Sequence, residues 1–129
     1  MSLIRKTLFL LLLVVSSFSL KAQRETEALV QNLQTANFDN LLSFWDNQVE
    51  VNLPELAGQR QFSAREANDL LKSFFNKKNI LGFDKSAARQ VGTTVYLTGK
   101  LISNTVKFNI TMLLQQNKNG ISIISVRVN

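Results

Sequence analysis

The stretch TTVYLTGKLISNTVKFNITMLLQQNKNGISIISVRV, residues 93–128, decides the fold class of this chain. Apolar and polar side chains alternate along residues 93–102 and again along residues 105–115, which is the pattern of strands with one buried face. Residues 117–120 end in Asn-Gly, the strongest local signal for a hairpin turn, and residues 121–128 are rich in β-branched side chains. The stretch therefore predicts an antiparallel meander.

The apolar side chains of this meander fall on one side of the sheet. Val95 and Leu97 share a side in the first strand, whereas Tyr96 faces the other way. The apolar side of the second strand consists of Val106, Phe108, Ile110, Met112 and Leu114. Because an antiparallel sheet commonly packs one face on the core, we expect helices to cover this apolar face.

Helical patterns precede the meander. Residues 24–37 place apolar side chains at helical spacing. A second short helix is expected to begin near Asn37, a residue type that favours turns and caps, and to end at Asp46. Ser63 and Glu66 fit a capping box, so a third helix is expected to follow them.

Shorter strand patterns lie between these helices. Residues 49–53 alternate, and Pro54 stops them because proline cannot donate to a strand ladder. Residues 59–62 predict a return strand and residues 81–87 a weaker strand. Helices followed mostly by strands predict an α+β fold, with an antiparallel sheet packed on N-terminal helices.

The N-terminus has the pattern of a secretory signal peptide. Two basic residues precede the unbroken apolar run 8–15, which is shorter than the about 20 apolar residues that a membrane-spanning helix needs. A cut after Ala22 removes residues 1–22 and leaves residues 23–129 as a single domain, and a cut after Ser19 is the alternative. We therefore expect a periplasmic or secreted protein with no membrane span after cleavage.

Charge and missing residue types exclude several functions. The basic side chains number 15 in the whole chain and 12 after the signal is removed, against 9 acids, so the net charge of the exported part is +3. These bases are scattered instead of forming one stripe, which argues against nucleic-acid binding. Cysteine and histidine are absent, so disulfides, histidine-ligated zinc and histidine relays are excluded. We expect no metal and no cofactor.

Three segments carry a resemblance to a known superfamily. Residues 36–39 and 44–51 resemble the first-helix turn and the entry into strand one of the nuclear transport factor 2-like superfamily, and residues 63–67 resemble its third helix. The chain also resembles a group of exported bacterial domains of unknown function with this fold, over nearly all of residues 24–128. The resemblance implies a curved sheet that forms a cone with the helices.

The resemblance leaves two classes of function open. Superfamily members include isomerases, dehydratases and polyketide cyclases, and also non-catalytic binding and dimerisation modules. Isomerase-type members need an acid or base and an oxyanion-stabilising tyrosine in the pocket, but Tyr96, the only tyrosine, is predicted to face away from the helices. Asp46, beside Trp45, could act as a general base, although a turn residue is the simpler interpretation.

Two sets of residues are candidates for binding. Aromatic and sulfur-containing side chains could line an apolar pocket in the mouth of the cone, or could simply be core. They are Phe44, Trp45, Phe74, Phe108 and Met112. On the other face of the meander, Tyr96 and Ile102 would suit a homodimer patch, or are isolated exposed apolar residues.

We therefore expect an exported, non-enzymatic binding or interaction module that takes a small apolar molecule or a protein partner in the cone. The alternative is a small isomerase, dehydratase or cyclase with an Asp-based pocket. The two differ in geometry, because the enzyme requires a carboxylate that points into a cavity with a hydrogen-bond donor in reach of the substrate.

Overall fold

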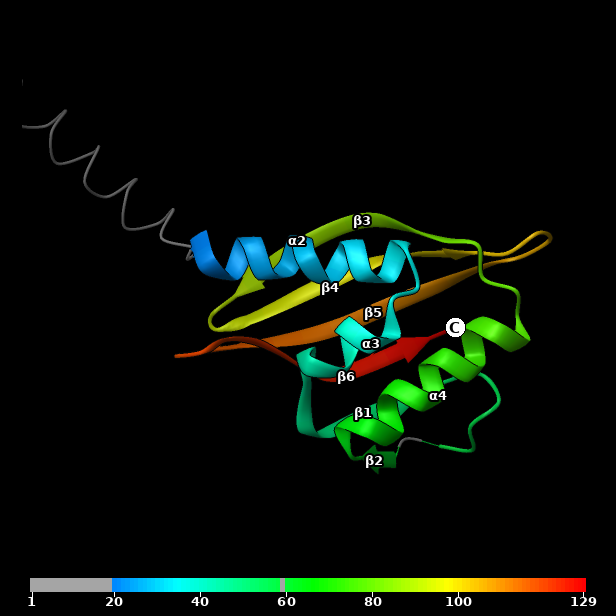
Figure 1. Cartoon of the computed structure of the whole chain (residues 1–129), viewed down its shortest axis with the longest axis horizontal. Helices are drawn as coiled ribbons and strands as arrows, with labels where there is room; N and C mark the ends of the chain where they lie inside the picture. The colour runs from blue at the N-terminus through cyan, green and yellow to red at the C-terminus, as the bar shows by residue number, and fades with distance from the viewer. Residues whose placement is uncertain (1–19, 59) are drawn as a thin grey trace, which may run out of the picture.

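One six-stranded sheet organises the chain, and its strands lie in the order β2-β1-β6-β5-β4-β3. The computed structural model describes residues 20–58 and 60–129. The strands are β1 (Trp45–Asn52), β2 (Arg60–Phe62), β3 (Gly82–Val91), β4 (Thr94–Ile102), β5 (Lys107–Asn117) and β6 (Gly120–Val128). The sheet curves but does not close, and β2 and β3 form its two edges (Figure 1).

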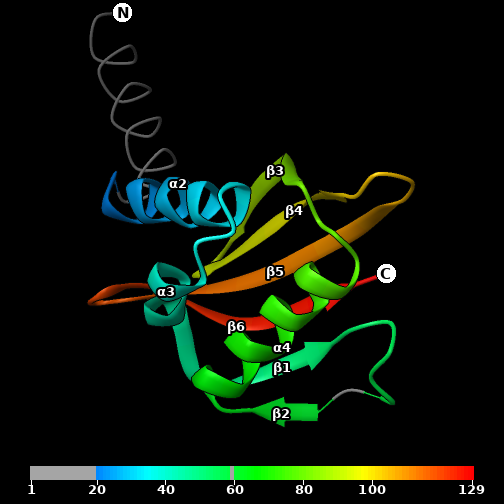
Figure 2. The same cartoon turned by 45° about the vertical axis from the view of Figure 1, so that its right-hand side comes forward.

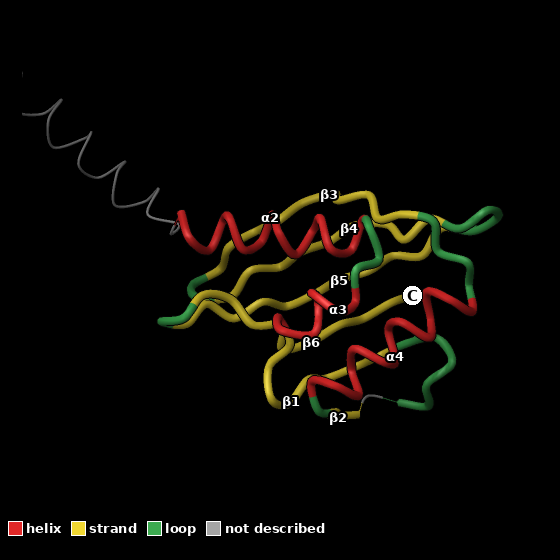
Figure 3. Tube along the Cα trace, viewed as in Figure 1, coloured by secondary structure: helices red, strands yellow, loops and turns green. Residues whose placement is uncertain are grey.

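The helical segments lie on one face of this sheet (Figure 2). They are α2 (Leu20–Gln34), α3 (Phe38–Leu41), the short 3-10 helix η1 (Leu42–Phe44) and α4 (Ala64–Lys77). α2 lies on the β3 side of the sheet, whereas α4 lies over β1 and β2 near the other edge (Figure 3). No helix of the described residues covers the opposite face, so the predicted α+β fold with one covered face is confirmed.

The C-terminal meander is confirmed by the pairing of the strands. β4 pairs antiparallel with β5, and β5 pairs antiparallel with β6. β3 adds a further antiparallel strand and runs on to Val91, past the predicted end at residue 87. β1 differs, because it pairs in parallel with β6. Periodicity could not reveal this neighbour, since alternation describes the two faces of a strand and not its partner.

The entry into β1 differs from the prediction. Asn37 does cap α3, where its side-chain oxygen accepts a backbone N–H at 3.2 Å. The helical region ends at Phe44, however, and Trp45 and Asp46 already belong to β1 instead of ending a helix. Trp45 is buried and pairs with Ile123 of β6, so tertiary contacts draw this part of the chain into a strand.

α4 begins and ends as predicted. The Glu66 amide donates to Ser63 Oγ at 3.2 Å, and the Ser63 amide donates to Glu66 Oε1 at 3.3 Å, which completes the capping box. Two residues beyond the helix, Asn79 has a φ of 52°, in the left-handed region that commonly ends a helix.

α2 begins at Leu20, earlier than the predicted Arg24. Ala22 is buried, and its carbonyl accepts a hydrogen bond from the Thr26 hydroxyl at 2.7 Å. Residues 1–19, which hold most of the predicted signal peptide, lie outside the described residues, so the signal and the cleavage site stay predictions. None of the described helices is long and apolar enough to cross a bilayer.

The Glu25 carboxylate of α2 accepts a hydrogen bond from the β5–β6 hairpin. Glu25 Oε2 accepts the Ile121 amide at 2.6 Å, just after the turn into β6. The preceding residue, Gly120, has a φ of 129°, and a Cβ there would run into the Glu25 carboxylate. Glycine is therefore required at this close approach.

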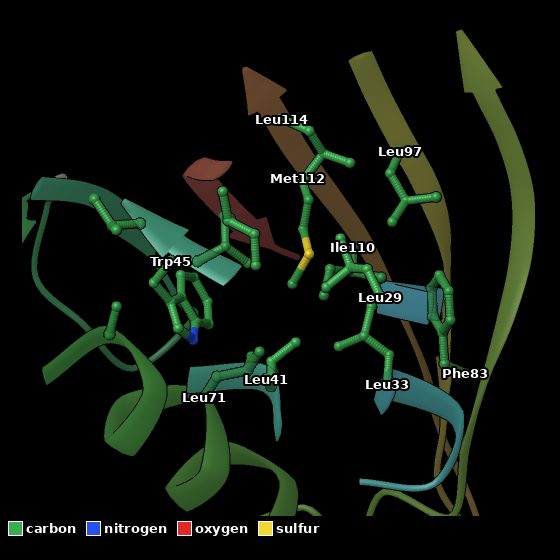
Figure 4. Packing of buried hydrophobic residues seen from close by; sticks show 14 of the residues in the cluster. Leu29, Leu33, Leu41, Trp45, Leu71, Phe83, Leu97, Ile110, Met112 and Leu114 are labelled. Carbon is green, nitrogen blue, oxygen red and sulfur yellow. The ribbon is translucent and has the colours of Figure 1, made fainter. Parts of the chain in front are cut away.

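The core fills the space between the helices and the sheet (Figure 4). Leu29 of α2 and Leu71 of α4 meet Met112 of β5 in this interior. Leu97 and Ile110 are 1 % and 2 % exposed, which confirms the predicted buried face of the meander for these positions. The assignment of Val106 to that face is wrong, because this residue precedes β5 and is 49 % exposed. Hydrophobic burial by both layers therefore holds the helices on the sheet.

Candidate functional site

The five side chains predicted to line an apolar pocket lie in the core or against it. Trp45, Phe74 and Met112 are buried, and Met112 is 1 % exposed. Phe44 and Phe108 are half-buried and pack against the same core. The Phe74 and Phe108 rings meet edge to face, with centroids 5.2 Å apart. These side chains fill the interior, and their role in ligand binding stays a prediction.

A buried hydrogen-bond chain holds Trp45. Its Nε1–H donates to Asn68 Oδ1 at 2.9 Å, and Asn68 Nδ2 donates to the Phe38 carbonyl at 3.0 Å. Asn68 is 6 % exposed, so both bonds are shielded from water. They join β1, α4 and α3 at one point and occupy the only polar side-chain atom of Trp45. The sequence gives only a weak signal for these hydrogen bonds, which is an asparagine on the apolar face of a helix.

The carboxylate considered for catalysis, Asp46, is half-buried in β1. Its Oδ1 accepts the amide of the neighbouring Asn47 at 2.9 Å. Tyr96 is 40 % exposed and lines a hollow on the other face of the sheet, to which Asp46 does not contribute. The acid and the tyrosine that isomerase chemistry would combine therefore do not line this hollow together.

Two adjoining hollows follow the exposed side of α4, and together we name them the α4 trough. The first, of about 270 Å³, is lined by Phe62, Glu66, Asp69, Leu70 and Ser73. The second, of about 190 Å³, is lined by Leu53, Glu55, Leu56, Leu70, Ser73, Phe74 and Lys77. Phe74 is thus the one member of the predicted ligand set that reaches the trough.

Charges on the rim differ between the two hollows. Glu55 accepts Lys78 Nζ at 2.8 Å and Lys77 Nζ at 3.4 Å, and these hydrogen bonds hold the pKa of Glu55 below its ordinary value. The negative charge of Glu55 is therefore compensated by two lysines, and the rim of the second hollow carries no unpaired acid. Glu66 and Asp69 give the first hollow a negative rim.

Another hollow lies on the face of the sheet without helices, which we name the open face. It has a volume of about 270 Å³ and is lined by Glu50, Tyr96, Thr111, Leu113, Ser125 and Arg127. Tyr96 of the predicted dimer patch lines this hollow. Ile102 is half-buried at the end of β4 and does not line it.

Strand register arranges the side chains of the open face in rows. One row crosses all six strands in the order Arg89, Tyr96, Leu113, Ser125, Glu50, Gln61. A cation therefore lies toward one end of the row and an acid toward the other, with Leu113 midway between them. The sequence assigned Tyr96 to this face, but it could not place Glu50 in the same row, because that neighbour depends on the parallel β1–β6 pair.

The fold is of a known class, that of nuclear transport factor 2-like proteins. An NTF2-like protein of unknown function from Cytophaga hutchinsonii superposes with a TM-score of 0.61 and 15% identity, covering 88% of this chain and 92% of its own. An NTF-2 like protein of unknown function from Burkholderia xenovorans superposes with a TM-score of 0.66 and 11% identity, covering 84% and 81%. At these identities the likeness shows the fold alone, and it confirms the cone.

The family is narrower than the class. The family model described as Domain of unknown function (DUF4783) matches residues 26–129, and the chain belongs to this family. A DUF4783 family protein from Bacteroides uniformis superposes with a TM-score of 0.71 and 14% identity, covering 80% of this chain and 94% of its own. No curated protein matches the chain. The predicted resemblance to an uncharacterised family with the cone fold is thereby confirmed.

Proposed function

We propose that this protein is a non-enzymatic interaction module that pairs with a second copy of itself through the open face. The observation that carries the proposal is the row of side chains across that face. Arg89 and Glu50 lie at equal distances, two strands each, on either side of Leu113. The row is therefore self-complementary about its centre.

A twofold axis along β5, between two open faces, makes this complementarity explicit. It places β4 of one copy over β6 of the other, and β3 over β1. Leu113 then faces its own copy, and Arg89 faces the Glu50 of the second copy, a residue that also keeps an interaction within its own chain. Each charge pair occurs twice, as an isologous interface requires, and the two pairs select this orientation of the copies.

The open face has the area that a stable pair needs. Its six strands, about 4.8 Å apart, span roughly 24 Å. A strand of 9 residues such as β4 extends about 30 Å. The product, roughly 700 Å², is close to the about 800 Å² per partner of a standard interface. Tyr96 and Leu113 supply apolar area near the centre of the face.

Two placements support a non-enzymatic role. The Asp46 carboxylate accepts the amide of its neighbour, and Asp46 does not line the hollow that Tyr96 lines, so that hollow lacks the acid that isomerase chemistry would pair with the tyrosine. Enzymatic isomerisation, dehydration or cyclisation stays a prediction, as does an apolar ligand in the cone. A thermal-shift screen with apolar small molecules tests the cone, because a ligand there must displace or rearrange buried Met112 and Trp45.

Sedimentation velocity across a wide range of protein concentration tests the pairing. The wild-type chain should approach twice the monomer mass, and Arg89→Glu should weaken the pair by at least about tenfold, or about 1.4 kcal/mol. Adding Glu50→Arg to that variant should restore it. Arg65→Glu is the control. It makes the same charge reversal at an exposed position of α4, on the helical side of the sheet, and should leave the mass unchanged. A monomer at every concentration would overturn the proposal.

A further inference from the structure

We propose that the α4 trough binds an extended segment of a partner protein, with a basic side chain in its first hollow and an apolar side chain in its second. The trough is lined largely by α4. This helix lies on the helical side of the sheet, away from the open face (Figure 2). This inference therefore goes beyond the pairing of two copies, and both surfaces can be occupied at once.

The two hollows repeat with the period of helix α4. The α4 residues of the first hollow are Glu66, Asp69, Leu70 and Ser73. Adding four to each position gives the α4 residues of the second hollow, which are Leu70, Ser73, Phe74 and Lys77. Four helical residues advance about 6 Å, and alternate residues of an extended chain are about 6.6 Å apart. An extended segment along α4 therefore brings residues i and i+2 over successive hollows.

The first hollow has the chemistry to receive a lysine or arginine. Phe62 and Leu70 form an apolar wall, and Glu66 and Asp69 stand on the rim. One Glu66 oxygen already accepts the Ser63 amide in the capping box, so Asp69 is the principal acceptor. The aliphatic stem of a basic side chain can pack on the wall while its charged head reaches the carboxylates.

The second hollow suits an apolar side chain. Leu53, Leu56 and Phe74 contribute apolar atoms to its lining. Glu55 is paired with both Lys77 and Lys78, so no uncompensated negative charge faces a ligand there. A segment that runs in the same direction as α4 therefore carries the order basic residue, any residue, apolar residue.

An edge strand borders the trough. β2 pairs with β1 on one side, and no other strand of the described residues lies on its outer side. Its outer backbone N–H and C=O groups are therefore available to an added segment. Main-chain hydrogen bonds to a sheet edge, combined with pockets for alternate side chains, are an established mode of peptide recognition.

Fluorescence anisotropy with labelled peptide amides tests the inference. The probe is a Gly/Ser-flanked Lys-Thr-Leu core, compared with Glu-Thr-Leu and Lys-Thr-Asp cores in the same flanks. The Lys-Thr-Leu peptide should bind, and each altered peptide should bind at least about tenfold more weakly, since each loses the side chain that one hollow selects. Failure of Lys-Thr-Leu to bind, or equal binding of all cores, would overturn the proposal.

Matched variants locate the binding. Ser73 lines both hollows, so Ser73→Trp should block the trough and abolish binding. Lys72→Trp, at the exposed position just before it, should leave binding unchanged. Asp69→Lys should switch the preference to the Glu-Thr-Leu peptide. Glu27→Lys, at an exposed position of α2, should leave the preference unchanged.

The variants also separate this inference from the proposed pairing. Circular dichroism checks that each variant is folded. Sedimentation of the Ser73→Trp variant should match the wild type, because Ser73 is not part of the open face. Peptide binding that survives Ser73→Trp, or a peptide preference unchanged by Asp69→Lys, would contradict the site while leaving the pairing of copies standing.

Discussion

Replacing Asn68 by leucine should destabilise this protein clearly. Asn68 Oδ1 accepts Trp45 Nε1–H at 2.9 Å and Asn68 Nδ2 donates to the Phe38 carbonyl at 3.0 Å, at a site that is 6 % exposed. Asn68→Leu keeps a side chain of similar size but leaves the buried Trp45 N–H without an acceptor, whereas the Phe38 carbonyl keeps the hydrogen bond that it accepts from the Leu42 amide. A buried donor without a partner costs about 1–3 kcal/mol, so we expect a loss of that size.

Urea unfolding followed by circular dichroism measures this loss. Trp45 is the sole tryptophan of the chain, so its fluorescence reports the same transition from the affected site. For a domain of this size each 1 kcal/mol lowers Tm by about 4–8 °C, so Tm should fall by at least about 4 °C. Asn76→Leu, at an exposed position of the same helix, is the control and should change stability by less than about 0.5 kcal/mol.

A double-mutant cycle tests the physical reason. Trp45→Phe removes the indole donor, so Asn68→Leu should cost less in that background, by about 0.5–3 kcal/mol. A cost for Asn68→Leu as small as that of the exposed control, or a cycle with no coupling energy, would refute the assignment of stability to the buried hydrogen bonds.

Three other contacts give smaller, separate tests. Glu25→Ala removes the acceptor of a β6 amide and should lower the unfolding free energy by about 1–3 kcal/mol in urea, with a smaller loss for Glu25→Gln, which keeps an acceptor. By NMR titration the pKa of Glu55 should lie below its ordinary value, and Lys78→Met should raise it. Because the pKa of Glu55 is depressed, the contribution of its ion pair with Lys78 to stability is present at neutral pH and is lost as the pH falls through the folded-state pKa. This contribution is small because the ion pair is exposed. The form 20–129 should be more stable than the form 23–129 by about 1–2 kcal/mol, since the shorter form lacks a buried alanine and the carbonyl that accepts the Thr26 hydroxyl. Equal thermal unfolding of the two forms would contradict this last expectation.

Local sequence signals were enough to predict most of the helices and strands. The Ser63 capping box is formed as predicted, and the Asn-Gly signal at residues 119–120 does join β5 to β6. These signals succeed because each depends on residues a few positions apart. The early start of β1 was missed for the opposite reason. Trp45 enters the strand because it is buried and pairs with Ile123, a residue far along the chain.

The candidate surfaces were predicted less well than the fold. Strand parity assigned Tyr96 to the open face, and the structure agrees. The alternation of a strand does not say which strand lies beside it, so Glu50 could not be placed in the row with Tyr96. The α4 trough was missed as well, because its wall joins Phe62, Leu53 and α4, which come together only when the loop before β2 folds back against the helix.

Composition and periodicity by themselves determined most of the buried residues, most of the helices and strands, and the kinds of chemistry that lack their side chains. These properties follow from the local preference of each side chain for water or for the core, and from the two periods of helix and strand. Only the tertiary structure decided that β1 lies parallel to β6 and that two hollows repeat along α4. Such features depend on contacts between residues distant in the chain, which no local pattern encodes.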